Sequence, residues 1–430
     1  MLPRVLAALM LGIGIGSCGD SPGPGPVGHP MDFYVAFPSN TDLVQNAELI
    51  VRVQGAPGVT GTVTGGGPTQ SFRADTTGFT AIPLNSDAIL NAWDTVQTRG
   101  VKIHADDSMT VVAENGKPFS MHVAMLLPAS AADTAFTIMS GGSGRPGSFL
   151  AIAARQAATT VTITPAATAG ARAAGAPFSV VLNDGDAYQL EATDTTGDLT
   201  GTRIHADKPI SVFGGHMLAN VPSGSGYAGF LWTSVPPHDR IAGTDFIAFP
   251  LTPRSGYRLR VLALQANTQL TSSGISGMAT SLSLGQVVEA RTTTAARITS
   301  NKPVLVAQLA EGYTVDGSGG NPGADPCLAL LTPVGRFTRA AAFAMPVAQA
   351  PLRYVNVVVP TAAAGGIQLN GATPAVTFSA IGATGYSGAA IPLTTVANRL
   401  TGTAAFGAQA YGWDTLPGTN GFCFPARSSF

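Results

Sequence analysis

The side chains that could hold a metal ion are few in this sequence, and they are scattered. Only two of the six histidines, His216 and His238, could come together with an acidic neighbour, Asp239, and no spacing requires that they do. The acidic turn at 183–186 lacks the twelve-residue calcium loop and its terminal glutamate. The remaining histidines are His29, His104, His122 and His205. The sequence therefore predicts no metal site and no cofactor.

Paired carboxylates would be the simplest source of catalysis, because glycoside hydrolases place two of them across one cleft. The close pairs in the sequence are Asp106 with Asp107, Asp184 with Asp186, and Asp194 with Asp198. All lie in predicted turns, where aspartate is favoured because it bonds to the backbone. The glycine-rich stretch 140–147 has no Gly-Lys-Ser/Thr after it and is a loop rather than a phosphate site. We expect no enzyme; the alternative is a glycan-active enzyme whose site is assembled from distant residues.

The first 31 residues contain an export signal and a spacer. A single charge, Arg4, precedes an apolar run over 5–15 that is too short to span a bilayer. Ile-Gly-Ser-Cys follows at 15–18 and resembles the lipobox of bacterial lipoprotein signal peptides, which implies that residues 1–17 are removed and that Cys18 carries the lipid. The alternative is a plain signal peptide with a chance cysteine. Alternating glycine and proline then make 18–31 an extended tether.

Two further cysteines, Cys327 and Cys423, lie in the last quarter of the chain. An exported protein meets oxidising conditions, so we predict that they form a disulfide. The alternative is a reactive or metal-binding thiol, but neither cysteine has a second cysteine or a histidine at ligand spacing. The expected location is the bacterial cell envelope, where lipid anchors the protein to the outer membrane, either exposed on the surface or facing the periplasm.

The composition indicates a folded protein with few charges. Only 11% of its 430 residues are charged, the net charge is −1, and its 52 glycines and 31 prolines point to many turns. Binding to nucleic acid requires clustered positive charge, which four separated lysines do not supply. We therefore expect no nucleic-acid partner.

The rest of the sequence repeats with a period of about 100 residues. The segments 103–112, 204–213 and 298–307 align without gaps, and a weaker fourth copy lies at 400–410. Asp106, Asp207 and Asn301 occupy one position of the repeat, where we predict a turn between two strands. His104 and His205 also share a position, which favours a structural role for both. A phenylalanine opens each unit, and β-branched runs follow.

These patterns predict an all-β protein of four repeats of about 95–100 residues. We expect tandem β-sandwich-like modules; a β-propeller with two blades per repeat is the alternative. The predicted limits of the four repeats are 32–118, 119–220, 221–315 and 316–430.

Three stretches in the middle of the chain, 159–165, 182–190 and 198–215, match a known pattern. The most recognisable motifs of this pattern are Leu-Thr-Gly-Thr at 199–202 and Asp-Lys-Pro at 207–209. They resemble the N-terminal domain family of the IgGFc-binding protein, over most of 33–425. The resemblance implies an all-β extracellular module that binds or adheres and has no catalytic residues. The stretch 227–237 lacks the charged residues of the family, so any site they formed there is lost.

The same stretch is rich in aromatic residues, which suggests a surface for binding. Tyr227, Phe230, Trp232 and Tyr313 could line an exposed face of the third module. The alternative is that they belong to the core, because Phe230 and Trp232 share one strand face. We therefore expect a lipid-anchored cell-surface protein with a non-catalytic binding or adhesion role toward an extracellular protein or glycan. The competing classes are the enzyme and a passive structural protein of the envelope.

Overall fold

A computed structural model of the chain describes residues 29–40, 47–144, 147–194, 197–316, 324–346, 350–416 and 419–427. The predicted all-β class is confirmed: the two α-helices of the described residues, α1 (His238–Ile241) and α2 (Tyr313–Asp316), have four residues each. Short 3₁₀ turns lie at Ser86–Ala88, Ala129–Ala131, Val334–Arg336 and Thr361–Gly366. No helix in this part of the chain has the length and apolar character needed to cross a membrane.

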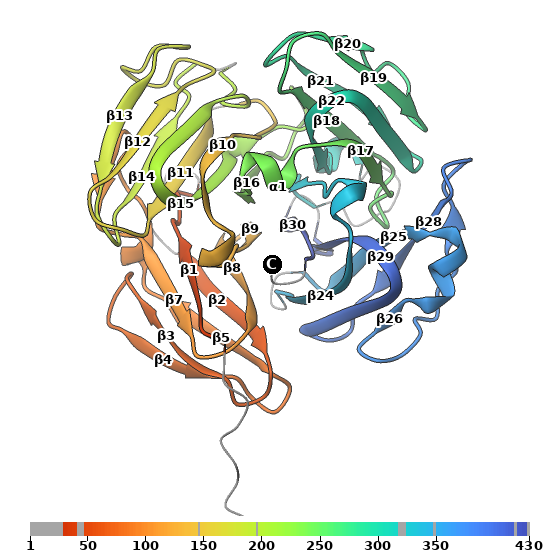
Figure 1. Cartoon of the computed structure of the whole chain (residues 1–430), viewed down its shortest axis with the longest axis horizontal. Helices are drawn as coiled ribbons and strands as arrows, with labels where there is room; N and C mark the ends of the chain where they lie inside the picture. Colours follow the sequence, from red (N-terminus) through yellow and green to blue (C-terminus); the bar gives the residue numbers. More distant parts are fainter. Residues whose placement is uncertain are drawn as a thin grey trace, which may run out of the picture.

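Four units with the same order of strands follow one another along the chain (Figure 1). The first contains β1 (Met31–Val35), β2 (Glu48–Gly55), β3 (Thr60–Thr64), β4 (Gln70–Arg73), β5 (Phe79–Leu84), β7 (Val101–Ala105), β8 (Met109–Lys117) and β9 (Ser120–Met125). The second contains β10 (Asp133–Thr137), β11 (Ser148–Ala154), β12 (Thr159–Thr164), β13 (Phe178–Leu182), β14 (Ala187–Glu191), β15 (Arg203–Ala219) and β16 (Gly229–Val235), and its sheet is extended by β6 (Thr95–Gln97).

The third and fourth units repeat this order. The third contains β17 (Gly243–Ala248), β18 (Tyr257–Ala263), β19 (Thr268–Ser273), β20 (Ser281–Leu282), β21 (Val287–Thr292), β22 (Ala296–Leu309) and β23 (Leu328–Leu330). The fourth contains β24 (Thr338–Ala344), β25 (Leu352–Pro360), β26 (Gln368–Leu369), β27 (Ser379–Ala380), β28 (Tyr386–Pro392), β29 (Ala397–Trp413) and β30 (Gly421–Pro425).

One long strand organises each unit. The first half of β15 pairs with β10 and β12, and its second half pairs with β11 and β16. The strands β22 and β29 are shared between two small sheets in the same way, and in the first unit β7 and β8 divide this role. Each unit is therefore sandwich-like, with the long strand bending from one sheet into the other.

The registers of the long strands confirm the repeat, including its weak fourth copy. The opening strand places Phe33 opposite Ile103, Phe136 opposite Ile204, Phe246 opposite Ile298, and Ala341 opposite Leu400. All eight side chains are buried. The apolar positions that align in the sequence thus meet in equivalent cores.

The predicted turn occurs only in the first unit, between β7 and β8. In the second unit β15 continues through Asp207, and the pairing with β10 shifts register there, so the strand bends without ending. The Asp207 carboxylate accepts the backbone N–H of Thr160 at 2.8 Å, and Asn301 accepts that of Gln269 at 2.8 Å. The repeated polar residue therefore ties the long strand to the third strand of its unit.

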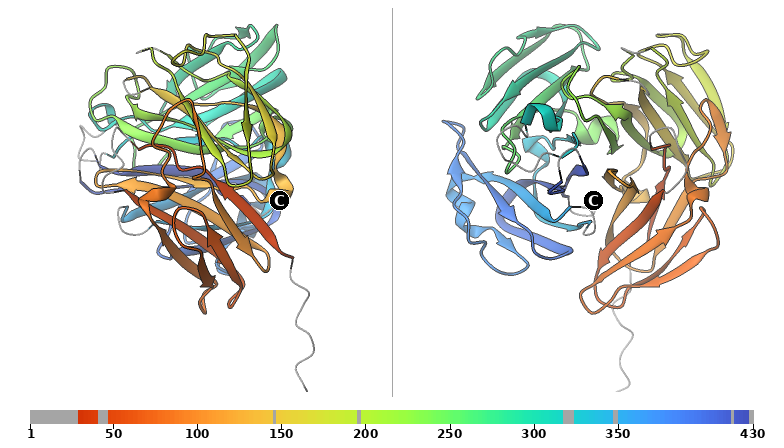
Figure 2. Two further views of the ribbon diagram at one scale, coloured as in Figure 1. Left: turned by 90° about the vertical axis from the view of Figure 1, so that its left-hand side faces the viewer. Right: turned by 180° about the vertical axis from the view of Figure 1, so that it is seen from behind.

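The four units close into a ring around one axis (Figures 1 and 2). Their last strands, β9, β16, β23 and β30, contact one another around the centre. One hydrophobic cluster joins Val112 and Val123 of the first unit to Phe343 and Val355 of the fourth. Closure around one axis is the feature that the propeller alternative predicts, while the two-sheet unit is the one expected of a sandwich.

Strand pairing also groups the chain into units. The strands β9, β16 and β23 pair with the long strand that precedes them, so the units are 31–125, 133–235, 243–330 and 338–425. The limits predicted from the sequence, at 118, 220 and 315, fall between the long strand and the last strand of each unit. The sequence repeat is visible in the long strand only. It does not show whether the strand that follows pairs with the preceding unit or with the next one.

Candidate binding surface

The predicted disulfide between Cys327 and Cys423 is confirmed, with a Cα–Cα distance of 5.7 Å. Both cysteines are fully buried. Cys327 directly precedes β23 of the third unit, and Cys423 lies in β30 of the fourth, so the bond joins two neighbouring units at the centre of the ring. The other predicted site, Cys18, lies outside the described residues.

A buried histidine connects three units at the same centre. His122, in β9, accepts the backbone N–H of Leu328 in β23 at Nε2 (3.3 Å) and donates from Nδ1 to the carbonyl of Val123 (3.1 Å). Its ring also lies against the backbone of Trp232 in β16. Burial lowers the pKa of His122 to about 4, so the ring is neutral at pH 7.

Acidification is expected to destabilise the ring through this histidine. The folded-state pKa of about 4 lies below the ordinary 6.5, so the unfolded chain binds the proton more tightly, and stability present above pH 6.5 is lost as the pH falls toward 4. The loss from His122 is about 2 kcal/mol at pH 5 and about 3 kcal/mol at pH 4. Burial lowers the pKa of His216 to about 4 as well, which adds in the same direction.

Denaturant unfolding of the wild type and of His122→Gln at pH 7 and pH 5 tests this expectation. The variant should start less stable at pH 7 and lose less between the two values. Equal losses in both proteins would show that His122 does not titrate on unfolding.

Two of the four aromatic residues proposed for the surface lie in the core instead. Phe230 and Trp232 are 1% and 0% exposed. Phe230 stacks on Phe149 with ring centres 5.8 Å apart, and Trp232 packs 5.4 Å from Phe37. Their assignment to an exposed surface is wrong. The strand β16 stands in the central ring, so both its faces are covered, and Leu231 between them is buried too.

The other two aromatic residues form a pair near the surface, in which Tyr227 is exposed and Tyr313 is half-buried. Tyr227, in the loop between β15 and β16, is 52% exposed, and its ring meets that of Tyr313 in α2 edge-on at 5.2 Å. The two loops also bond to each other, because the backbone N–H of Gly226 donates to Thr314 Oγ1 at 3.0 Å. The pair therefore joins the second and third units at the surface.

Equivalent loops of the other two units expose apolar side chains as well. Phe119, in the turn between β8 and β9, is 65% exposed, and Leu416, between β29 and β30, is 56% exposed. Each loop joins the long strand of its unit to the last strand. We call the set of Phe119, Tyr227, Tyr313 and Leu416 the loop rim.

The four loops lie at one end of the ring. The contacts of His122 with Leu328 and of Cys327 with Cys423 show that the last strands begin at one level. The first and last strands reach the opposite end of the ring, because Met31 lies against Met109 at the start of β8 and Ala426 bonds to Ala408. The nine residues of β8 separate the two ends by about 25 Å.

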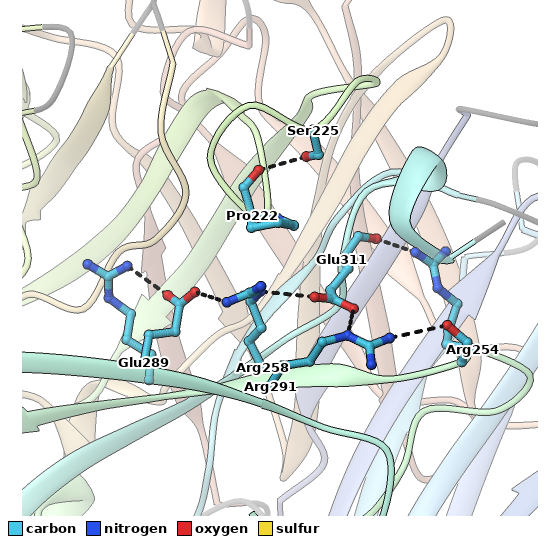
Figure 3. Close-up of polar contacts among 9 residues, drawn as sticks. Pro222, Ser225, Arg254, Arg258, Glu289, Arg291 and Glu311 are labelled. Atoms are coloured by element: carbon cyan, nitrogen blue, oxygen red, sulfur yellow. Dashed lines mark hydrogen bonds and ion pairs between the residues drawn. The ribbon is translucent and has the colours of Figure 1, made fainter. Parts of the chain in front are cut away.

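A buried ion-pair cluster holds the loop that carries Tyr313 (Figure 3). The carboxylate of Glu311, two residues earlier, is fully buried and accepts Arg258 Nε at 2.9 Å and Arg291 Nε at 2.7 Å. Arg254 donates to the backbone carbonyl of the same residue. These charge-assisted bonds fix both the side chain and the backbone at the start of the loop.

The cluster continues across the boundary between the second and third units. Glu289 accepts Arg258 at 3.3 Å and Arg260 at 3.2 Å, and Arg260 also donates to Asp198 of the second unit. Asp198 directly precedes the Leu-Thr-Gly-Thr motif, to which the sequence analysis assigned no role. Sequence reasoning missed Glu311 and its arginines; the signal is a carboxylate directly after the apolar strand end, in a chain with few charges.

The acidic pairs and histidines take structural positions. Asp186 is buried and accepts the backbone N–H of Asn183 at 2.8 Å, and Asp106 bonds to the hydroxyl of Thr60. His216 Nδ1 accepts the N–H of Leu218 at 3.1 Å, and His238 lies 3.4 Å from the hydroxyl of Thr137. Within the described ranges, no three His, Cys, Asp or Glu side chains are placed to hold a metal ion.

Comparison with known proteins gives two matches and one negative result. The model of the family described as "IgGFc binding protein" matches residues 122–412. The IgGFc-binding protein of Homo sapiens is 28% identical over 196 residues, which are 44% of this chain and 4% of the human protein. The chain thus corresponds to a small part of that relative. No solved structure matches the chain significantly.

Proposed function

We propose an extracellular binding function for this chain, which belongs to the IgGFc binding protein family. The loop rim is the binding face, and the partner is a protein or glycan outside the cell. One observation carries the proposal: the same loop of all four units presents an apolar or aromatic side chain at one end of the ring. Single exposed apolar residues are common, but side chains from four equivalent loops at one end of the ring make a candidate binding surface.

The rigidity of the rim supports this function. Binding costs less when contact residues are already ordered, and aromatic side chains are frequent among the residues that dominate binding energy. Tyr227 and Tyr313 contact each other, and the buried Glu311 cluster fixes the loop beneath them.

The position of the chain ends fits an anchored protein that adheres through the rim. The ring would be attached at the end where residue 31 lies, and the rim would face away from the membrane. The Gly/Pro tether from Cys18 to residue 31, if extended, would reach about 40 Å. We propose that the chain is lipid-anchored in the bacterial envelope in this way.

Binding is tested with an array of glycans and host proteins that includes the Fc fragment of immunoglobulin G, because the human relative is named for it. The exported chain should bind at least one partner, and Tyr227→Ser with Tyr313→Ser should weaken that binding about tenfold or more. Val181→Ser is the matched control, since Val181 is 57% exposed on β13, outside the rim. A partner bound equally by all three proteins, or no partner at all, would refute the rim.

Anchoring is tested by Cys18→Ser. The variant should leave the membrane fraction and lose labelling by a palmitate analogue, because the thiol that accepts the lipid is gone. Ser17→Gly keeps a small residue before the cysteine and should retain the label. A Cys18→Ser protein that is still labelled and membrane-bound would contradict the lipobox.

A further inference from the structure

A groove of about 570 Å³ lies between the second and third units, away from the loop rim. This volume is typical of sites for small molecules. One wall is apolar and belongs to the third unit, with Leu262, Leu264 and Leu284, the last of which is 60% exposed. The other wall is a polar sheet face of the second unit, and His238 lies at its edge. None of the described lining residues is acidic.

The polar wall is formed by three paired strands, β10, β15 and β12. Arg203 lies between Thr137 and Thr164 in one row across the sheet. His205 lies between Ala135 and Thr162 in the next row. Because side chains two residues apart share a face, the guanidinium and the imidazole both point from this wall into the groove. Three threonine hydroxyls surround them.

In the first and third units, a carboxylate of the same unit lies against the equivalent basic residues. Asp32, directly before Phe33, pairs with His104 at 2.8 Å and Lys102 at 3.4 Å. Asp245, directly before Phe246, holds Arg297 with two bonds of 2.8 Å. The registers place these aspartates at one position of the repeat.

The second unit has Ala135 at that position, directly before Phe136. Its basic residues remain, and within the described residues no carboxylate pairs with Arg203 or His205. The neighbouring units therefore indicate which group can bind beside these basic residues: an external carboxylate would occupy the place that Asp32 and Asp245 fill there. The fourth unit also has an alanine, Ala340, but it has Thr401 in place of the histidine, and its Arg399 lines none of the described pockets.

We propose that this groove binds an acidic sugar residue through its carboxylate. Arg203 donates two parallel N–H bonds to the carboxylate, and His205 supplies a third donor. The threonine hydroxyls exchange hydrogen bonds with the sugar hydroxyls, and the leucines cover the apolar face of the sugar ring. The site is separate from the loop rim, so this proposal does not depend on whether the rim binds a partner.

The test uses glucuronate, with glucose as the neutral control of the same size and lactate as a monocarboxylate without a sugar ring. Binding to the full exported chain is followed by saturation-transfer NMR. Glucuronate should bind at least about tenfold more tightly than glucose, since charge-assisted hydrogen bonds add their stability only to the acid. It should also bind more tightly than lactate.

Two variants locate the site. Ala135→Asp installs the carboxylate that the first and third units already tolerate, so it should fold normally and lower the affinity for glucuronate about tenfold or more. Arg203→Gln should have the same effect, whereas Arg399→Gln, the equivalent arginine outside the groove, should change nothing. Glucuronate binding that survives Ala135→Asp and Arg203→Gln, that equals glucose binding, or that is weaker than lactate binding would overturn the proposal.

Discussion

Reduction of the Cys327–Cys423 disulfide is expected to lower the free energy of unfolding by about 5 kcal/mol. The bond closes a loop of 96 residues, and the chain-entropy model gives a stabilisation of that size for loops near 100 residues. Both sulfur atoms are buried at the centre of the ring, so the folded state also loses a covalent connection between the third and fourth units.

Denaturant unfolding with and without a strong reductant measures the loss, and Cys327→Ser with Cys423→Ser should reproduce it without reductant. Hydrogen exchange should then increase in β23 and β30 together, because each strand carries one end of the bond. A loss below about 1 kcal/mol, or exchange that increases in the fourth unit alone, would contradict a bond that joins two units.

The sequence predicted what is local to one unit. The aligned apolar positions identified the strand class and the four repeats, because Ile103, Ile204 and Ile298 occupy the same core position in their units. The ring could not be predicted in the same way. It depends on contacts such as His122 with Leu328, which join residues 206 positions apart and follow no period.

The residues of the candidate surface could likewise be predicted only in part. Tyr227 and Tyr313 were identified by residue type, but Phe230 and Trp232 could not be assigned, because an aromatic pair on one strand face looks the same whether the ring covers it or water does. The exception at Ala135 was visible in principle. Asp-Phe opens the first and third units and Ala-Phe the second, but the difference acquires meaning only once the register places it beside Arg203 and His205.

Glu311 is expected to be among the most sensitive single residues of the chain, and Glu311→Gln should cost about 3–5 kcal/mol. Its carboxylate is fully buried and is the shared partner of Arg258 and Arg291, whose side chains are 20% and 36% exposed. The substitution removes the counter-charge of Arg291 and one of the two carboxylates that pair with Arg258, in a place where water cannot fully replace it. Breaking a buried ion pair from one side is costly for this reason.

Glu289→Gln is the matched control, because Glu289 also pairs with two arginines but is 25% exposed, and its bonds are longer, at 3.3 and 3.2 Å. Water can solvate the arginines that lose this partner, so the free energy of unfolding should fall by about 1 kcal/mol or less. Denaturant unfolding compares the two variants. The Glu311 variant should also weaken binding at the loop rim under conditions where it remains folded, since Tyr313 depends on the loop that Glu311 fixes. Equal losses of stability in the two variants would mean that the burial of Glu311 does not make its ion pairs more important than those of Glu289. Unchanged binding at the loop rim would mean that the Glu311 cluster does not hold the rim in its binding conformation.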